Sequence, residues 1–475
     1  MIRDLRPYPT YSTASVGWIS MLPSGWRTLR AKYVFREVDT RSLTGKEELL
    51  SVSHLTGVTP RSEKTVTMFL AKSNVGHKLC QPDDLVINTM WAWMGALGVS
   101  RHAGLVSPSY GVYRPLAGSA MHPRFLDLLL RIPAYIEEYQ KRSTGVNSSR
   151  LRLYPEQFLG MEVIVPPRDE QATIVRYLDW ACGRLDRAIR AKRKIIALLN
   201  EQKQAIIHRT VTRGLNSNVP LKSSGAPSIG LIPDHWQMRR LRTLVIRIDQ
   251  GVSPQADGFL AGGDSWGVLK SGCVNHGVFR EKEHKRLASN FRFDPQITVN
   301  IGDVLISRAC GSPKLVGSVG RVWELNYRLI LSDKTFRPVF TPSIDADFAV
   351  YAMNSRYYRE QVEQAISGAE GLANNLPLSS LRDFVLAIPP IVEGREIANT
   401  LRERLAETDQ TISRTEREID LLREYRTRLI ADVVTGKLDV REAVAGLPIE
   451  EPESEEDAFA AEGEQIEEEL SELEA

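Results

Sequence analysis

The chain has 475 residues, enough for two or three domains that each bury their own hydrophobic core. Hydrophobic residues make up 42% and charged residues 25% of the sequence, which is typical of globular proteins. No run of about 18 apolar residues occurs, and the N-terminal residues lack the apolar stretch of a signal peptide. These features predict a cytoplasmic protein without membrane association.

The net charge of +2 conceals an uneven distribution. Residues 450–475 contain 13 acidic and no basic residues, which leaves 61 basic against 46 acidic residues, a net charge of +15, in residues 1–449. A body this positive suits a polyanionic partner such as nucleic acid. A solvated surface followed by an acidic solubility tail fits the same charges, so charge alone does not decide between them.

The predicted elements divide the first half of the chain into four parts. Residues 1–17 form an N-terminal segment, and residues 18–167 form a mixed α/β domain with short strands, one of which enters a loop at Val86–Asn88. Residues 168–213 form a long helix, which follows a Pro-Pro pair and has acidic residues in its first turn. Residues 214–228 are rich in Ser, Gly and Pro and form a linker.

The second half of the chain follows the same plan. Residues 229–390 form a second mixed α/β domain with a strand at Val304–Ser307, and residues 391–436 form a second long helix. Residues 437–475 form a C-terminal region. Its acidic end is predicted to be a disordered solubility tail, with contact to a partner as the alternative.

An internal repeat explains this plan. Ile19–Trp26 matches Ile229–Trp236 at a shift of 210 residues, and Val165–Pro167 matches Ile388–Pro390 at a shift of 223. The growing shift means that the second copy is 13 residues longer, all within its divergent interior. The chain therefore consists of two copies of one unit, each with a constant frame and a variable middle.

The two long helices carry an apolar seam with a seven-residue period, which is typical of a coiled coil. The seam contains Leu178, Leu185, Ile189, Ile196 and Leu199 in the first helix and Leu401, Leu405, Ile412, Ile419 and Leu422 in the second. Polar breaks fall at matching places, Lys192 with Thr415 and Lys203 with Arg426. An amphipathic helix on a globular core is the alternative. If the helices pair, connectivity makes them antiparallel and puts the two domains at the two ends of a rod of roughly 63 Å.

The sequence lacks the motifs of a catalytic centre. It has no G-x-x-x-x-G-K-[ST] phosphate loop, no H-E-x-x-H and no G-x-S-x-G. The Pro-Pro pairs follow the aliphatic residues Val165 and Ile388, which lack the side-chain hydrogen bonds that adenine methyltransferases use at this place. The four cysteines lie far apart and the histidines have no ligand spacing, which argues against disulfides and a metal site. We therefore predict a chain with no catalytic residues, no metal and no cofactor.

Each α/β domain contains a loop in which hydrogen-bond donors lie beside glycines. Arg and Asn read base edges by paired hydrogen bonds, Lys and Ser contact phosphates, and glycine lets a loop approach a groove closely. The candidate DNA-binding residues are Asn88, Trp91, Trp93, Ser100, Arg101 and His102 in the first domain and Lys270, Asn275, Ser307, Arg308, Lys314 and Lys334 in the second. The alternatives are core positions for the two tryptophans and a structural ion pair for Arg308.

The arrangement resembles the specificity subunits of type I restriction–modification enzymes. The resemblance covers residues 11–440 and rests on the LPSGW and IPDHW openings, DDLVINTMWAWMGALGVS, GDVLISRACGSP, and the VPP and IPP turns before the helices. It implies an α+β fold with two target-recognition domains and an antiparallel two-helix coiled coil, related by a pseudo-two-fold repeat. Each domain would read one half of a bipartite, asymmetric double-stranded DNA target, and helix length would set the half-site separation.

The same resemblance implies partner subunits. Two methyltransferase (modification) subunits would dock along the paired helices, so we assign the seam residues to partner binding. Those subunits would bind S-adenosylmethionine and methylate adenine N6, and restriction/translocase subunits would use ATP and Mg²⁺. Two other classes stay open, a stand-alone DNA-binding or architectural protein and a single-chain methyltransferase.

Overall fold

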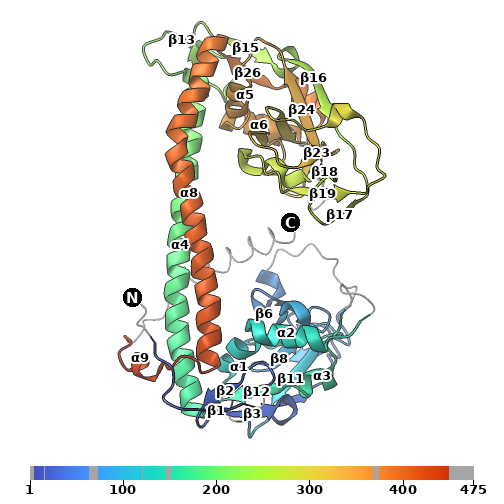
Figure 1. Cartoon of the computed structure of the whole chain (residues 1–475), viewed down its shortest axis with the longest axis vertical. Coiled ribbons are helices and arrows are strands. Elements are labelled where there is room, and N and C mark those ends of the chain that lie inside the picture. The colour runs from blue at the N-terminus through green and yellow to red at the C-terminus, as the bar shows by residue number, and fades with distance from the viewer. Residues whose placement is uncertain are drawn as a thin grey trace. The chain divides into compact units, whose positions relative to one another are not determined.

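The computed structural model describes residues 5–14, 16–63, 73–119, 121–145, 151–366 and 374–448. The chain forms two compact units (Figure 1). Unit 1 comprises residues 1–193 and 416–475, and unit 2 comprises residues 194–415. Residues 18–167 are called head 1 and residues 229–390 head 2 below. The acidic tail, residues 450–475, lies outside the described residues.

Each head is built on a four-stranded antiparallel sheet with the same strand order. In head 1 the order is β4 (Phe35–Glu37), β11 (Gly111–Pro115), β8 (Leu85–Ile87) and β9 (Leu97–Val99). In head 2 it is β16 (Val245–Gln250), β24 (Thr335–Phe340), β20 (Val304–Ser307) and β22 (Val319–Arg321). β8 and β20 are buried along their whole length, as their apolar sequences LVI and VLIS require.

Shorter strand pairs complete the repeated part of each head. They are β1 (Tyr11–Thr13) with β2 (Met21–Pro23) and β3 (Arg27–Arg30) with β12 (Glu162–Val165) in unit 1, and β13 (Leu221–Ser223) with β14 (Leu231–Pro233) and β15 (Gln237–Arg240) with β26 (Val385–Ile388) in unit 2. β1 and β13 come from the N-terminal segment and the linker. These segments are therefore part of the repeat as well.

The variable interiors differ in their strands. Among its described residues, head 1 has two pairs, β5 (Leu50–Ser53) with β6 (Gly57–Pro60) and β7 (Lys78–Cys80) with β10 (Gly104–Val106). Head 2 has a second four-stranded sheet, β17 (Ala256–Asp257), β19 (His284–Leu287), β18 (Trp266–Leu269) and β23 (Arg328–Ile330), and the pair β21 (Ala309–Cys310) with β25 (Asn374–Asn375). The second sheet encloses its own apolar cluster. The longer interior of the second copy thus forms an additional layer.

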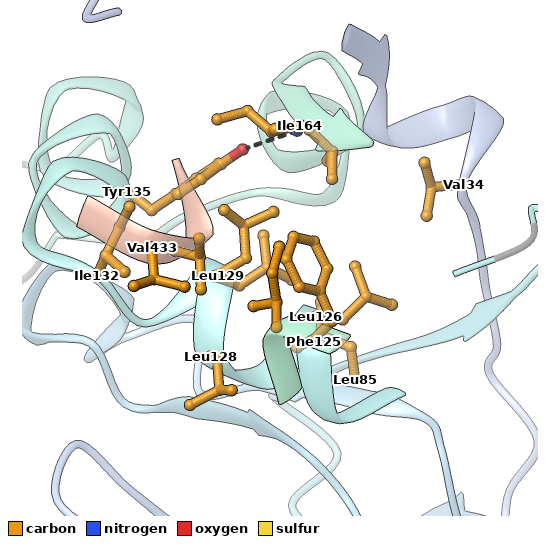
Figure 2. Close-up of a cluster of buried hydrophobic side chains, with 14 of the residues drawn as sticks. Val34, Leu85, Phe125, Leu126, Leu128, Leu129, Ile132, Tyr135, Ile164 and Val433 are labelled. Carbon is orange, nitrogen blue, oxygen red and sulfur yellow. Dashed lines mark hydrogen bonds between the residues drawn. The ribbon is translucent and has the colours of Figure 1, made fainter. Parts of the chain in front are cut away.

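Short helices cover the sheets. They are α1 (Pro123–Leu130), α2 (Pro133–Arg142) and α3 (Pro155–Leu159) in head 1, and α5 (Ala346–Ala352), α6 (Arg356–Ala365) and α7 (Leu378–Asp383) in head 2. α1, α2 and α3 each begin with proline, whose fixed φ suits the first helical turn. Figure 2 shows the core beneath α1 and α2, where Phe125, Leu129 and Tyr135 lie with Val433 of the second long helix. The Tyr135 hydroxyl accepts a hydrogen bond from the Ile164 N–H at 3.3 Å.

The long helices α4 (Arg168–Arg213) and α8 (Ile391–Val434) lie side by side within each unit (Figure 1), and a short helix, α9 (Arg441–Ala445), follows α8. In unit 1, Lys192 contacts Glu418 at 2.5 Å and Asp186 contacts Arg426 at 3.5 Å. As the residue number falls along α4 it rises along α8, so the pairing is antiparallel.

In unit 2, Lys203 contacts Asp409 at 2.5 Å. This ion pair is the repeat equivalent of Asp186 with Arg426, because both residues are displaced by 223 positions. Three of the predicted polar seam positions, Lys192, Lys203 and Arg426, therefore pair with acidic residues of the opposite helix instead of merely interrupting the apolar seam.

An arginine links strands at the same place in each head, half-buried in head 1 and buried in head 2. In head 1, Arg114 donates two hydrogen bonds to Asp84, both at 2.8 Å. In head 2, Arg337 donates to Asp249 at 2.8 Å and to Asp303 at 3.0 Å, and its side chain is only 6% exposed. Asp84 and Asp303 directly precede β8 and β20. Because a buried charge without a partner is costly, each network fixes the start of the central strand.

We predict that Arg337→Ala lowers the free energy of unfolding by about 3–5 kcal/mol, because two partly buried carboxylates lose their counter-charge. Chemical denaturation followed by circular dichroism measures the change. The control is Arg328→Ala, which removes an exposed ion pair with Asp264 and is expected to cost about 1 kcal/mol or less. Equal losses in the two variants would contradict the role assigned to burial.

Candidate nucleic-acid interface

The candidate loop of head 1, residues 88–102, is held by its own hydrogen bonds. Asn88 is buried at the end of β8 and donates to the Tyr110 hydroxyl at 3.1 Å. The Ser100 hydroxyl is buried and donates to the His102 carbonyl at 2.7 Å. Gly95 has a φ of 88°, and a Cβ there would lie 2.9 Å from Ile136, so this turn requires glycine. The loop is therefore ordered by its polar residues.

The exposed side chains of this loop are fewer than the predicted set. Trp91 is 47% exposed, and Arg101 is exposed as well. Trp93 is half-buried and its indole N–H donates to the Met90 carbonyl at 3.0 Å, while His102 is half-buried. Trp91 and Arg101 are thus the exposed members of the predicted set in this loop, whereas Asn88, Trp93 and Ser100 hydrogen-bond within head 1.

In head 2, the turn around Asp333 brings three of the predicted residues together. Arg308 donates to the Asp333 carbonyl at 2.8 Å, and its guanidinium lies 5.7 Å from the centre of the Phe336 ring. Lys334 contacts the Asp333 carboxylate at 2.9 Å. Ser307 is fully buried at the end of β20. Arg308 thus contacts a backbone carbonyl and an aromatic ring, and these contacts are not the structural ion pair that was the alternative.

The remaining candidates of head 2 differ in exposure. Lys314 is exposed. Lys270 is half-buried and contacts Glu283 at 3.5 Å. Asn275 lies in η6 (Ser271–Gly277), a 3-10 segment that packs against β20 and β22, and its Oδ1 atom is buried without a hydrogen-bond partner. The following His276 has a left-handed φ of 58°.

An arginine-lined cavity in head 2 was not predicted from the sequence. Its volume is about 460 Å³, and its lining includes Arg242, Arg247 and Arg382. Asp383 lies beside them and contacts Arg242 at 3.0 Å and Arg240 at 3.3 Å. Guanidinium groups bind phosphate oxygens through paired hydrogen bonds. The basic stretch after Trp236 was the sequence signal for this feature, but it did not indicate that residues from α7 would join it.

The predicted seam residues are largely enclosed within the chain. Those that are buried are Leu178, Leu185, Ile189, Leu401, Leu405 and Ile419, and those that are half-buried are Ile196, Leu199, Ile412 and Leu422. A buried side chain offers little surface to another subunit. Exposed apolar side chains on the same helices are Ile195, Leu198, Val392, Leu421 and Tyr425. Leu198 and Leu421 are repeat equivalents. The sequence signal for them is a Leu-Leu dipeptide that occurs at this place in both long helices.

The described residues contain no group of three or more His, Cys, Asp or Glu side chains that could hold a metal ion. Nor does any described helix combine the length and apolar character needed to cross a membrane.

All four cysteines are free thiols. Burial raises the pKa of Cys80 to about 12 and that of Cys273 to about 12, and it also raises the pKa of Cys182.

The arrangement of two repeated α+β heads on paired antiparallel helices is similar in fold to a solved structure. This structure, from work on complex assembly and conformational transition of the type I R-M system, covers 88% of this chain and 99% of its own, with a TM-score of 0.55 and 17% sequence identity. The predicted fold class is confirmed by this match.

Sequence relatives point to the same family. The chain is 29% identical over 185 residues to the type I restriction enzyme EcoEI specificity subunit of Escherichia coli, which is 38% of this chain and 31% of the relative. It is 26% identical over 216 residues to the EcoKI specificity subunit of Escherichia coli K12, which is 44% of this chain and 45% of the relative. The chain thus spans less than half the length of these curated relatives, and no protein-family model matches it. The resemblance predicted from the motifs is confirmed.

We predict that Cys310 reacts fastest with a thiol reagent at pH 8, because it is the one cysteine that is not buried. The raised pKa values of the three others keep them as thiols well above pH 8, and the thiolate is the nucleophile. Absorbance stopped-flow with an aromatic disulfide measures the rates. Cys310→Ser should abolish the fast phase, and a fast phase that survives this substitution would contradict the assigned burial.

Proposed function

We propose that this chain is the non-catalytic DNA sequence-recognition subunit of a type I restriction–modification complex. The observation that carries the proposal is the duplication of one head on paired helices, shared in fold with a type I system and in sequence with type I specificity subunits. The two heads have central sheets with the same strand order but differ in their interiors, and this combination suits a DNA target with two different half-sites. The net charge of +15 over residues 1–449 suits the DNA backbone.

We infer that each head reads its half-site with the loop after its central strand. In head 1, Arg101 is the proposed base reader, and Trp91 offers an exposed flat ring beside it. In head 2, Lys314 is the exposed cation nearest in sequence to Arg308, and the arginine-lined cavity beside Asp383 suits a phosphate group. The buried members of the predicted set hold these loops in place, which lowers the entropic cost of binding.

The proposed partners are two methyltransferase subunits, because a duplicated surface presents the same features twice. Leu198 and Leu421 are one such repeated feature, each exposed on its long helix. S-adenosylmethionine would bind to those subunits, and ATP and Mg²⁺ to restriction/translocase subunits if these join. The alternative is a stand-alone DNA-binding or architectural protein, which would bind its target tightly without any partner.

Affinity purification from the native host separates these possibilities. Methyltransferase subunits recovered in twofold excess over this chain, together with methylated adenines at a bipartite sequence in the host genome, are the expected results. Methylation must be lost when the gene for this chain is deleted. Tight, sequence-specific DNA binding by the chain alone, with no methyltransferase recovered, would favour the stand-alone alternative. Methyl transfer by the purified chain alone would refute the non-catalytic role.

We predict that Arg101→Ala weakens recognition of one half-site by about 1–3 kcal/mol for each lost bidentate contact and leaves the other half-site unaffected. Arg308→Ala should act in the same way on the opposite half-site, with an added loss of stability because its contacts with Asp333 and Phe336 disappear. Binding of the assembled complex to DNA with one altered half-site at a time measures both effects. A uniform loss on specific and non-specific DNA would place these arginines on phosphates instead.

We predict that a four-residue insertion after Ile196, matched by one after Ile419, lengthens the unread spacer between half-sites. Four residues add about 6 Å of helix and slightly more than one turn, so the apolar seam is roughly preserved. The added length equals about two base pairs at about 3.4 Å each. Methylation mapping in cells measures the spacer. The same insertion after the exposed linker residue Asn216 is the control and should leave the spacer unchanged. An active double-insertion variant with the original spacer would show that the helices do not measure the distance.

A further inference from the structure

An ion-pair group joins head 1 to the long helix that follows it. Arg124 of α1 contacts Asp127 of the same helix at 3.1 Å and Asp179 of α4 at 3.1 Å. Arg124 also donates from Nε to Asp179 at 3.1 Å. These three residues are called triad 1. It consists of a central cation on the head with one anion on the head and one anion on the long helix.

Head 2 has a group of the same form with every charge reversed. Asp347 of α5 contacts Arg402 of α8 at 2.6 Å, and it also contacts Arg321 of β22. These three residues are called triad 2. The Trp323 ring lies between the two arginines, with its centre 4.7 Å from the Arg402 guanidinium and 5.0 Å from that of Arg321. The central residue is therefore an anion, flanked by a cation on the head and a cation on the long helix.

Two of the three members of each triad, the central residue and its partner on the long helix, occupy equivalent places in the repeat. Arg124 and Asp347 are each the second residue of their helices and lie 223 positions apart, as do Asp179 and Arg402. The shift of 223 is also the one that relates β12 to β26 and aligns the seams of α4 and α8. The contact between head and long helix has thus kept its place in both copies while its polarity has been inverted.

We propose that this inverted polarity matches each head to its own long helix and rejects the other copy's helix. In a repeat protein the two head–helix contacts share one shape, so apolar packing alone discriminates weakly between them. A head 1 that docked on α8 would put Arg124 against Arg402. A head 2 that docked on α4 would put Asp347 against Asp179. Like charges repel where the native pairs attract, so each exchanged contact is penalised, both within a chain and between two chains. The proposal does not depend on DNA binding.

The test uses the full chain with the charges of triad 1 changed. Arg124→Asp and Asp179→Arg each place like charges together, and each should lower the thermal unfolding midpoint by about 2–4 °C. The double variant Arg124→Asp/Asp179→Arg restores an attractive pair and should recover most of this loss. An unchanged midpoint in both single variants would show that the pair contributes nothing.

Refolding then measures how well each head selects its own long helix. In the double variant each head presents an aspartate, at position 124 or 347, to an arginine on the long helix, at position 179 or 402. Either head can therefore pair with either helix. We expect the fraction that returns from denaturant to the elution position of the undenatured protein to fall several-fold relative to wild type, with the remainder in oligomers that exchange heads. Recovery equal to that of wild type overturns the proposal, because polarity would then not select the helix.

Two further variants keep the result interpretable. Arg124→Gln/Asp179→Asn abolishes both repulsions of the exchanged arrangement and leaves only the Asp347–Arg402 attraction to favour the native one, so refolding recovery should fall in this variant also. In the charge-exchanged variant the new aspartate at position 124 lies beside Asp127, and this repulsion alone could prevent folding. Unchanged recovery of the neutral variant contradicts the proposal even in that case. The matched control is Arg356→Glu/Glu360→Arg, which exchanges an ion pair within α6 and should alter neither the midpoint nor the recovery.

Discussion

The structure depends on one constraint, namely that neither apolar core is complete without both long helices. The core of unit 1 contains Tyr177 and Leu178 from α4 together with Leu429 and Val433 from the far end of α8. The core of unit 2 contains Ile397 and Leu401 from α8, together with Ile207 and Val211 from the far end of α4. Each head is therefore stabilised by the start of its own helix and by the end of the other.

This sharing explains where polar residues are allowed in the helices. Near the heads the helix faces are apolar because they enter a core, and a buried Leu or Ile there contributes about 1.5–3 kcal/mol. Farther along, the helices face only each other, and Lys192, Lys203 and Arg426 pair with acids on the opposite helix. Such exposed pairs add little stability but fix register and direction. The antiparallel direction of the pairing places the end of α8 in the core of unit 1 and the end of α4 in the core of unit 2.

The sequence predicted the repeat, the two long helices and their antiparallel pairing, because these depend on spacing and connectivity. The helix bounds of 168–213 agree with α4, and 391–436 exceeds α8 by two residues. The prediction could not reach the burial of single side chains. Ser100 follows β9, Ser307 ends β20, and both look like hydrogen-bond donors in the sequence. Ser100, however, bonds within its own loop, and Ser307 is fully buried. Trp91 shows the opposite outcome, since a tryptophan beside a buried strand could equally have joined the core and is exposed instead.

The same reasoning indicates which parts of each head are free to diverge. The frame is fixed by contacts that cross the chain: the arginine at Arg114 or Arg337 ties the central strand to its neighbours, and α1 or α5 packs on a long helix. The interiors pack on the opposite face of the central sheet, so the second sheet of head 2 and Leu305 of β20 enclose an apolar cluster distinct from the one that the long helices enter. An interior can then change its strands and loops without disturbing the helices. A protein whose frame and variable region are stabilised separately can alter what it binds while keeping the surface on which its own halves assemble.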